Sequence, residues 1–152
     1  MLDQTDKDIL KLLQANSKLT IKEVASKLHL TSTPIFERIK RLENEEYILS
    51  YKAQIDRKKI GLGLVAFCNI QLKSHEASFI AKFEKDILQF DEIVECYHIA
   101  GMFDYLLKVM INDMDEYQNF VAKKLASIEN LGQVQSAFVM TEVKSNSDLP
   151  VK

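Results

Sequence analysis

The side chains best suited to chemistry lie in one short basic stretch near the N-terminus. Arg38 and Arg41 fall on the same predicted helix, and a guanidinium fork on a guanine edge contributes about 1 to 3 kcal/mol of base discrimination. Ser32 and Thr33, at the start of that helix, can reach phosphates or base edges, and Lys40 is suited to hold the phosphate backbone. This combination is typical of nucleic-acid recognition.

A structural interpretation of the same stretch is also open. Glu37 and Glu43 lie at helical spacing from Lys40 and Arg41, and such exposed ion pairs contribute only tenths of a kcal/mol. An ordinary solvated helix face would show the same pattern, so the stretch needs support from the rest of the chain.

Net charge differs between the two ends of the chain. Residues 1–60 carry 12 Lys and Arg against 9 Asp and Glu, whereas residues 61–152 carry 8 against 13, which gives −2 for the whole chain. A basic head on an acidic body is typical of a nucleic-acid-binding domain joined to a non-binding one. An excess of three charges is also common on ordinary surfaces, so this signal is weak.

Three short helices are predicted to position the basic stretch. Asp3 can cap the first helix, with Asp6 favouring its positive N-terminal end. Thr20 and Glu23 have the spacing of a capping box for the second helix, and the third begins within residues 31–34. A capped helix, a short turn and a helix with a basic face form the layout of a helix-turn-helix.

The pattern changes to strand and helix beyond residue 47. Alternating apolar residues predict a strand within residues 48–55, and a polar stretch with two glycines marks a boundary near residue 64. The following strands are predicted at 65–73, 93–100, 105–112 and 134–144, with helices at 76–90 and 114–128. Two βαβ units predict an α+β fold, a ferredoxin-like βαββαβ sandwich with two helices on one sheet face. We therefore expect a head (1–47), a strand and linker (48–64) and a body (65–152).

Apolar residues occur on both faces of the predicted sheet. Ile93, Tyr97 and Ile99 alternate with Val94 and Cys96, so the face without helices also needs a cover. The simplest cover is the same face of a second copy, which predicts an isologous homodimer.

An enzyme is one alternative, because Cys96, His98 and Asp104 lie close in the sequence and could form a thiol nucleophile with a base. Cys96 and His98 share one face of an apolar strand, where packed side chains are the more common outcome. Cys68 and Cys96 have neither zinc-site spacing nor the pattern of a disulfide framework. We predict no catalytic residue, metal or cofactor.

The expected compartment is the cytoplasm. No apolar run approaches the roughly 18 to 20 residues of a membrane span, and the acidic residues 1–6 do not resemble a signal peptide. No membrane partner is expected.

Several motifs carry a resemblance to a known family. They are Leu2-Asp3-x-x-Asp6-x-x-Ile9-Leu10, Leu30-Thr31-x-Thr33-Pro34-x-x-Glu37-Arg38-Ile39-x-Arg41-Leu42-Glu43, Glu95-Cys96-x-x-x-x-Gly101-x-Phe103-Asp104-Tyr105-Leu106-Leu107, Asp113-Met114-x-x-Tyr117 and Val139-Met140-x-Glu142-Val143-Lys144. They follow one another through nearly the whole chain. The sequence resembles the Lrp/AsnC family of feast/famine transcription regulators.

The resemblance implies a winged-type DNA-binding head, a linker strand and a ligand-sensing body that forms homodimers and often octamers or other rings of dimers. Such proteins are associated with the bacterial or archaeal nucleoid and respond to small amino acids. The recognition helix falls on residues 32–45, so the DNA-contact role passes to Ser32, Thr33, Glu37, Arg38 and Arg41, with Lys40 beside them. His29 stands where relatives commonly have a turn glycine, and histidine tolerates a positive φ at some cost.

The resemblance places the effector near the turn between the second and third strands of the body, at an interface between dimers. Here Gly101 lets the backbone approach a ligand, Asp104 offers a carboxylate to an α-ammonium group, and Ser136 matches a position that often carries a hydroxyl. Ala100 and Met102 depart from the polar residues frequent in that turn, which favours methionine or leucine. Gly101 and Asp104 also suit a tight hairpin without a ligand.

A rival comes from a related fold, because sirohaem decarboxylases resemble this family yet process a tetrapyrrole. His75 and His98 are then the candidate acids. The basic third helix favours the regulator. The sequence therefore predicts a sequence-specific DNA-binding transcription regulator whose assembly and DNA binding respond to a small amino acid.

Overall fold

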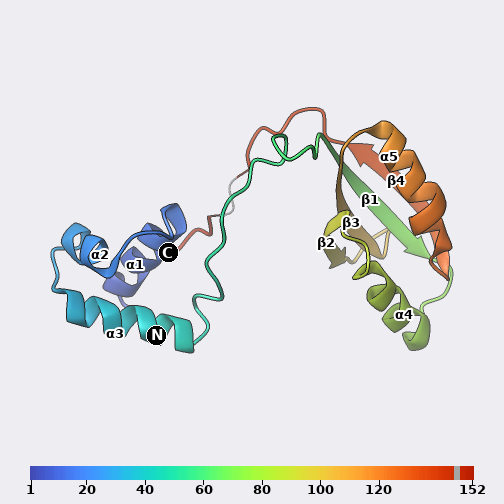
Figure 1. The fold of residues 1–152 in the computed structure, drawn as a ribbon. Helices are drawn as coiled ribbons and strands as arrows, with labels where there is room; N and C mark the ends of the chain where they lie inside the picture. The colour runs from blue at the N-terminus through green and yellow to red at the C-terminus, as the bar shows by residue number, and fades with distance from the viewer. Residues whose placement is uncertain (146–147) are drawn as a thin grey trace. The chain divides into compact units, whose positions relative to one another are not determined.

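The chain folds into two units, which the computed structural model describes for residues 1–145 and 148–152 (Figure 1). One unit comprises Met1–Gln54 and Lys144–Lys152, and the other comprises Ile55–Val143. The C-terminal residues thus pack with the N-terminal helices, whereas the sequence pattern grouped them with the body. The functional boundaries at residues 47 and 64 stay a prediction.

Three helices form the first unit, α1 (Gln4–Ala15), α2 (Ile21–Lys27) and α3 (Ser32–Asn44). The predicted caps are confirmed, since Asp3 and Thr20 each form a capping box. Thr31 precedes α3 without a side-chain capping bond. The helices bury a small apolar core of Ile9, Leu13, Val24, Ala25, Ile35 and Leu42.

The turn between α2 and α3 has the backbone conformation expected from the sequence. His29 has a φ of 56°, in the left-handed region that favours glycine. The Leu30 N–H donates to the Ala25 carbonyl at 2.9 Å. This turn sets the direction in which α3 begins.

The strand predicted within residues 48–55 is absent from the described chain. These residues have no regular secondary structure, and the described sheet contains β1 to β4 alone. A strand needs a neighbour that takes its backbone N–H and C=O groups. Leu49 and Ile55 are 83% and 64% exposed, whereas Ile48 packs against the helical core and the Tyr51 hydroxyl donates to Glu43 Oε1 at 2.7 Å. The alternation therefore reflects side chains that do not pair as a strand within the described residues.

The second unit contains a four-stranded sheet. Its elements are β1 (Leu64–Leu72), α4 (Ala77–Ile87), β2 (Ile93–His98), β3 (Tyr105–Ile111), α5 (Met114–Asn119), a π-helical stretch (Phe120–Lys124), a 3₁₀ turn (Leu125–Ser127) and β4 (Leu131–Phe138). The strand order is β2-β3-β1-β4, and each neighbouring pair is antiparallel. The predicted α+β fold is confirmed, with β4 shorter than expected.

The two faces of this sheet differ in burial. Cys68 and Leu107, on the helix-covered face, are fully buried together with Phe83 of α4 and Phe120. On the opposite face, residues such as Leu106 are only partly buried. That a second copy covers this face stays a prediction. No helix in the described residues is long and apolar enough to cross a membrane.

Candidate functional sites

Four of the six predicted DNA-contact residues lie exposed on α3. Ser32 and Thr33 occupy its first turn, where free backbone N–H groups and the positive end of the helix dipole favour phosphate. Glu37 and Lys40 follow on the exposed surface, and the Lys40 ammonium lies 5.9 Å from the centre of the Phe36 ring. This surface can receive an extended, negatively charged partner.

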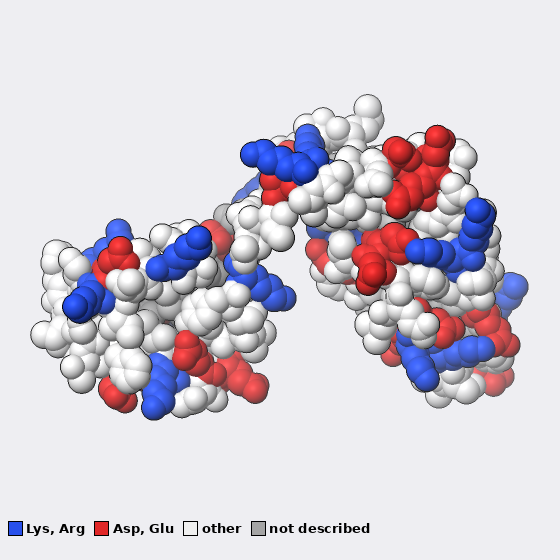
Figure 2. Space-filling model, viewed as in Figure 1, with Lys and Arg blue, Asp and Glu red and all other residues white. Residues whose placement is uncertain are grey.

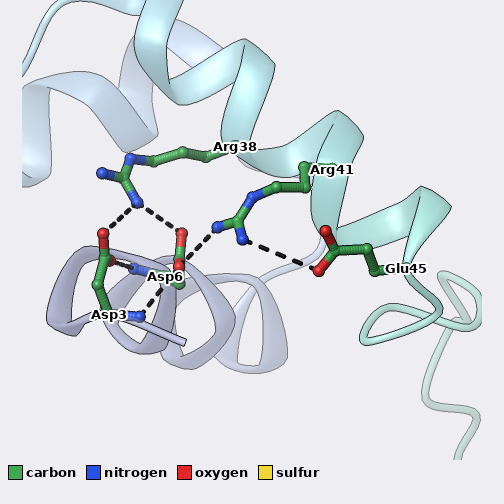
Figure 3. A network of polar contacts seen from close by, with 5 residues as sticks. All are labelled: Asp3, Asp6, Arg38, Arg41 and Glu45. Carbon is green, nitrogen blue, oxygen red and sulfur yellow. Dashed lines mark hydrogen bonds and ion pairs between the residues drawn. The ribbon is translucent and has the colours of Figure 1, made fainter. Parts of the chain in front are cut away.

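The other two, Arg38 and Arg41, extend instead toward the start of α1 (Figure 3). Arg38 Nη1 donates to Asp3 Oδ2 at 2.6 Å and to Asp6 Oδ1 at 2.7 Å. Arg41 Nη2 donates to Asp6 Oδ2 at 2.6 Å, and its Nη1 lies 3.8 Å from Glu45 Oε2. Each guanidinium therefore already has a carboxylate partner.

Asp6 is the centre of this network because its side chain is only 1% exposed. Burial opposes its ionisation, but hydrogen bonds from Arg41, the Asp3 backbone and Arg38 outweigh burial and lower its pKa from 3.8 to about 2. An ionised Asp6 between two guanidinium groups fixes α3 on α1. In this chain the contacts give Arg38 and Arg41 a role in positioning α3. Their base-reading role stays a prediction, since the two side chains are still 31% and 37% exposed.

The spacing of the charged residues in the sequence is a signal for this network. Asp3 and Asp6 are three residues apart on one helix, and Arg38 and Arg41 are three residues apart on another. Opposite charges with equal spacing on two helices can attract each other pairwise where the helices pack together. The charges on the visible face of the protein are otherwise interspersed (Figure 2).

The predicted ligand turn connects β2 and β3 and is exposed at its tip. Gly101 has a φ of +153°, and within the described chain no heavy atom beyond its two sequence neighbours lies within 4 Å of the position a Cβ would take. Met102 is 85% exposed, and Ala100 is exposed as well. The Ile99 N–H donates to the Asp104 carbonyl at 2.8 Å and closes the turn. The backbone at Gly101 is thus accessible to a ligand.

Asp104 has partners within the protein. Its Oδ2 accepts from the Leu72 N–H at 2.7 Å, and its Oδ1 lies 2.8 Å from His75 Nε2. Burial opposes ionisation of Asp104, but these two hydrogen bonds lower its pKa below the ordinary value. Asp104 therefore joins the end of β1 to the β2–β3 turn. Each carboxylate oxygen keeps a second lone pair for a further donor.

Ser136 does not join the other predicted ligand residues in this chain. It lies on β4, which β1 separates from the β2–β3 hairpin. Its Oγ accepts from the Tyr117 hydroxyl at 2.5 Å, on the face packed against α5. This bond does not follow from the sequence, because strand alternation alone does not say which face the helix covers.

Two family descriptions match the chain. Residues 65–149 match the Lrp/AsnC ligand-binding domain, and residues 2–48 match a winged helix-turn-helix DNA-binding domain. The chain belongs to the Lrp/AsnC family.

Similar proteins match almost the whole chain. The DNA-binding transcriptional activator DecR of Escherichia coli K12 is 34% identical over 152 residues, which is 100% of both chains. A transcriptional regulator of Neisseria meningitidis, solved in complex with L-methionine, is 31% identical with a TM-score of 0.95 and covers 99% of this chain and 97% of its own. An AsnC family regulator from Agrobacterium tumefaciens is 34% identical with a TM-score of 0.93. The match covers 98% of this chain and 97% of the Agrobacterium chain.

This Lrp/AsnC protein is accordingly a DNA-binding transcription regulator with a ligand-binding body. The proteins quoted above are named as regulators. His98, a candidate acid of the enzyme alternative, stacks on the Tyr105 ring with 4.6 Å between the ring centres. His75, the other candidate acid, is held by Asp104.

Proposed function

We propose that this regulator binds DNA through the exposed surface of α3, with Ser32, Thr33, Glu37 and Lys40 as the contacting side chains. The observation that carries the proposal is the network at Asp6, because it holds α3 on α1 while Ser32, Thr33, Glu37 and Lys40 stay exposed. A dimer can place two such helices in major grooves about 34 Å, or a multiple of that, apart. Its operator is then nearly palindromic.

The proposed effector is an apolar amino acid, with L-methionine first and leucine second. The Neisseria meningitidis relative with L-methionine bound supports this choice. In this chain the turn offers an accessible backbone at Gly101, the apolar side chain of Met102 and the lone pairs of Asp104 for an ammonium group. Ala100 completes the turn, and Ser136 is proposed to join the site from another subunit at an interface between dimers.

Effector binding is proposed to act through assembly. The protein forms homodimers, which join into an octamer or another ring of dimers in the cytoplasm, on the nucleoid. A ligand shifts the equilibrium between dimers and larger rings only if it binds one assembly more tightly than another. If saturating methionine changed the affinity for DNA but left the sedimentation coefficient of the protein unchanged, this coupling would be contradicted.

A thermal-shift screen against the twenty amino acids tests the site. A ligand at about 100 times its dissociation constant adds roughly 2.7 kcal/mol of stability. We expect methionine to give the largest shift, and Asp104→Asn to abolish that shift. Asp91→Asn, a change at an exposed turn residue, serves as the matched control.

The outcomes of the screen separate the proposals. A methionine shift that survives Asp104→Asn would remove Asp104 from the site. A screen without any hit would remove the amino-acid effector and leave DNA binding in place. Soret absorbance in the purified protein would instead favour the tetrapyrrole enzyme.

A further inference from the structure

The C-terminal residues of the chain lie against the DNA-binding head. Figure 1 shows the C-terminus beside α1. The Leu149 N–H donates to Gln14 Oε1 at 2.7 Å, and Gln14 Nε2 donates to the Leu149 carbonyl at 3.2 Å. One side-chain amide thus satisfies both polar groups of a residue 135 positions away. Such two-point pairing fixes the direction of the C-terminal segment on the helix.

Apolar surface lies around this pair of hydrogen bonds. A hollow of about 600 Å³ lies within the first unit. Its lining includes Leu10, Leu13 and Ile48, together with Leu149 and Val151 of the C-terminal segment. Val151 is partly buried, and its N–H donates to the Leu149 carbonyl at 2.9 Å. Leu149 itself is 72% exposed, so the segment is held on the N-terminal helices by the Gln14 hydrogen bonds and by the partly buried Val151.

The connectivity gives this contact a mechanical consequence. The chain leaves the head unit after Gln54 and returns to it at Lys144. When the C-terminal segment is docked, two chain segments join the head to the rest of the protein. When the C-terminal segment is undocked, only the segment that follows Gln54 links the head to the rest of the protein and restricts its orientation.

We propose that residues 148–152 form a strap that docks on α1 through Gln14 and restricts the orientations of the DNA-binding head. Restriction lowers the entropy that is lost when two heads engage one operator together. The strap therefore strengthens binding to paired half-sites and leaves the binding of one head to one half-site unchanged. This role rests on the DNA-binding function of the head.

Docking is tested first, without DNA. Gln14→Ala removes both hydrogen bonds to Leu149, whereas Gln4→Ala changes the same residue type on the same helix, where Gln4 bonds Asp8. We expect the Leu149 amide to exchange with solvent at least about tenfold faster in Gln14→Ala than in the wild-type chain. Gln4→Ala should keep the wild-type exchange rate. Equal exchange in all three proteins would overturn the proposal.

The effect on DNA is tested with an operator selected from random DNA by the wild-type protein. The ratio of affinities for the paired site and for one half-site should fall about three- to tenfold in Gln14→Ala. A chain truncated after residue 147 should show the same fall, and single half-site affinity should stay constant in both variants. An unchanged ratio in a variant that has lost protection of Leu149, or an equal loss on both DNAs, would refute the strap. Failure of the wild-type protein to select any DNA from the random pool would refute the DNA-binding function itself.

Discussion

At the scale of single residues, Asp6 determines how α3 is held. Its buried carboxylate accepts hydrogen bonds from Arg38 and Arg41, and an ion pair that loses one buried partner leaves the remaining charges uncompensated. We predict that Asp6→Asn lowers the free energy of unfolding by about 2 kcal/mol at pH 7, which corresponds to the lowering of its pKa. Urea denaturation measures this change, with Asp8→Asn on the same helix as the control.

The same prediction has a defined pH dependence. The pKa of Asp6 is lower in the folded chain, about 2, than its ordinary value of 3.8. Its stabilisation is therefore present above about pH 4 and is lost as the pH falls toward 2. The difference between wild type and Asp6→Asn should shrink over that interval. A difference that stayed constant down to pH 2.5 would mean that the charge of Asp6 contributes nothing.

Residues in local motifs were the most predictable. The cap at Asp3 follows from neighbouring residues alone and is confirmed. The positive φ of His29, which is also observed, was expected because the family resemblance places a turn glycine at this position. The ion pairs of Arg38 and Arg41 with α1 were not predicted, because their carboxylate partners lie 32 or 35 positions earlier in the chain. A helical motif indicates which residue types are present, but the packing of another helix decides which of them stay exposed.

At the scale of elements, the junction of β1 and β4 depends on Gly132. A Cβ at this position would lie 2.6 Å from the Gln71 carbonyl oxygen, and the strand register shifts between Ile70 and Leu72. Because backbone must move to admit the added methyl group, we predict that Gly132→Ala destabilises the protein by about 1 to 3 kcal/mol. Thermal unfolding measures this loss of stability. Gln133→Ala, at an exposed β4 position, is the control and should change the stability of the protein little.

Elements were predictable where their partners are close in the sequence. The βαβ units were correctly assigned, since each strand pairs within the second unit. The segment 48–55 was assigned wrongly because apolar alternation does not supply a neighbouring strand. The docking of Leu149 on Gln14 joins the two ends of the chain, and no local pattern predicts a contact at that separation.

At the scale of the whole molecule, the sheet face opposite α4 and α5 is predicted to lie in the homodimer interface. Leu106 lies on that face and pairs across the strands with Asn69 and Tyr97. A carboxylate there would be buried by a second copy without a partner, at a cost of several kcal/mol. Leu106→Glu should therefore convert the assembly to monomers in sedimentation equilibrium.

Leu88→Glu supplies the matched control, because Leu88 is 85% exposed at the end of α4. It should keep the wild-type assembly, and circular dichroism should show that both variants remain folded. A Leu106→Glu protein that still sediments with the wild-type mass would place the interface elsewhere. Because a monomer presents one α3 to the DNA, the monomeric variant should also lose preference for paired half-sites while it still binds one, which links the interface on the body to the way the heads read DNA.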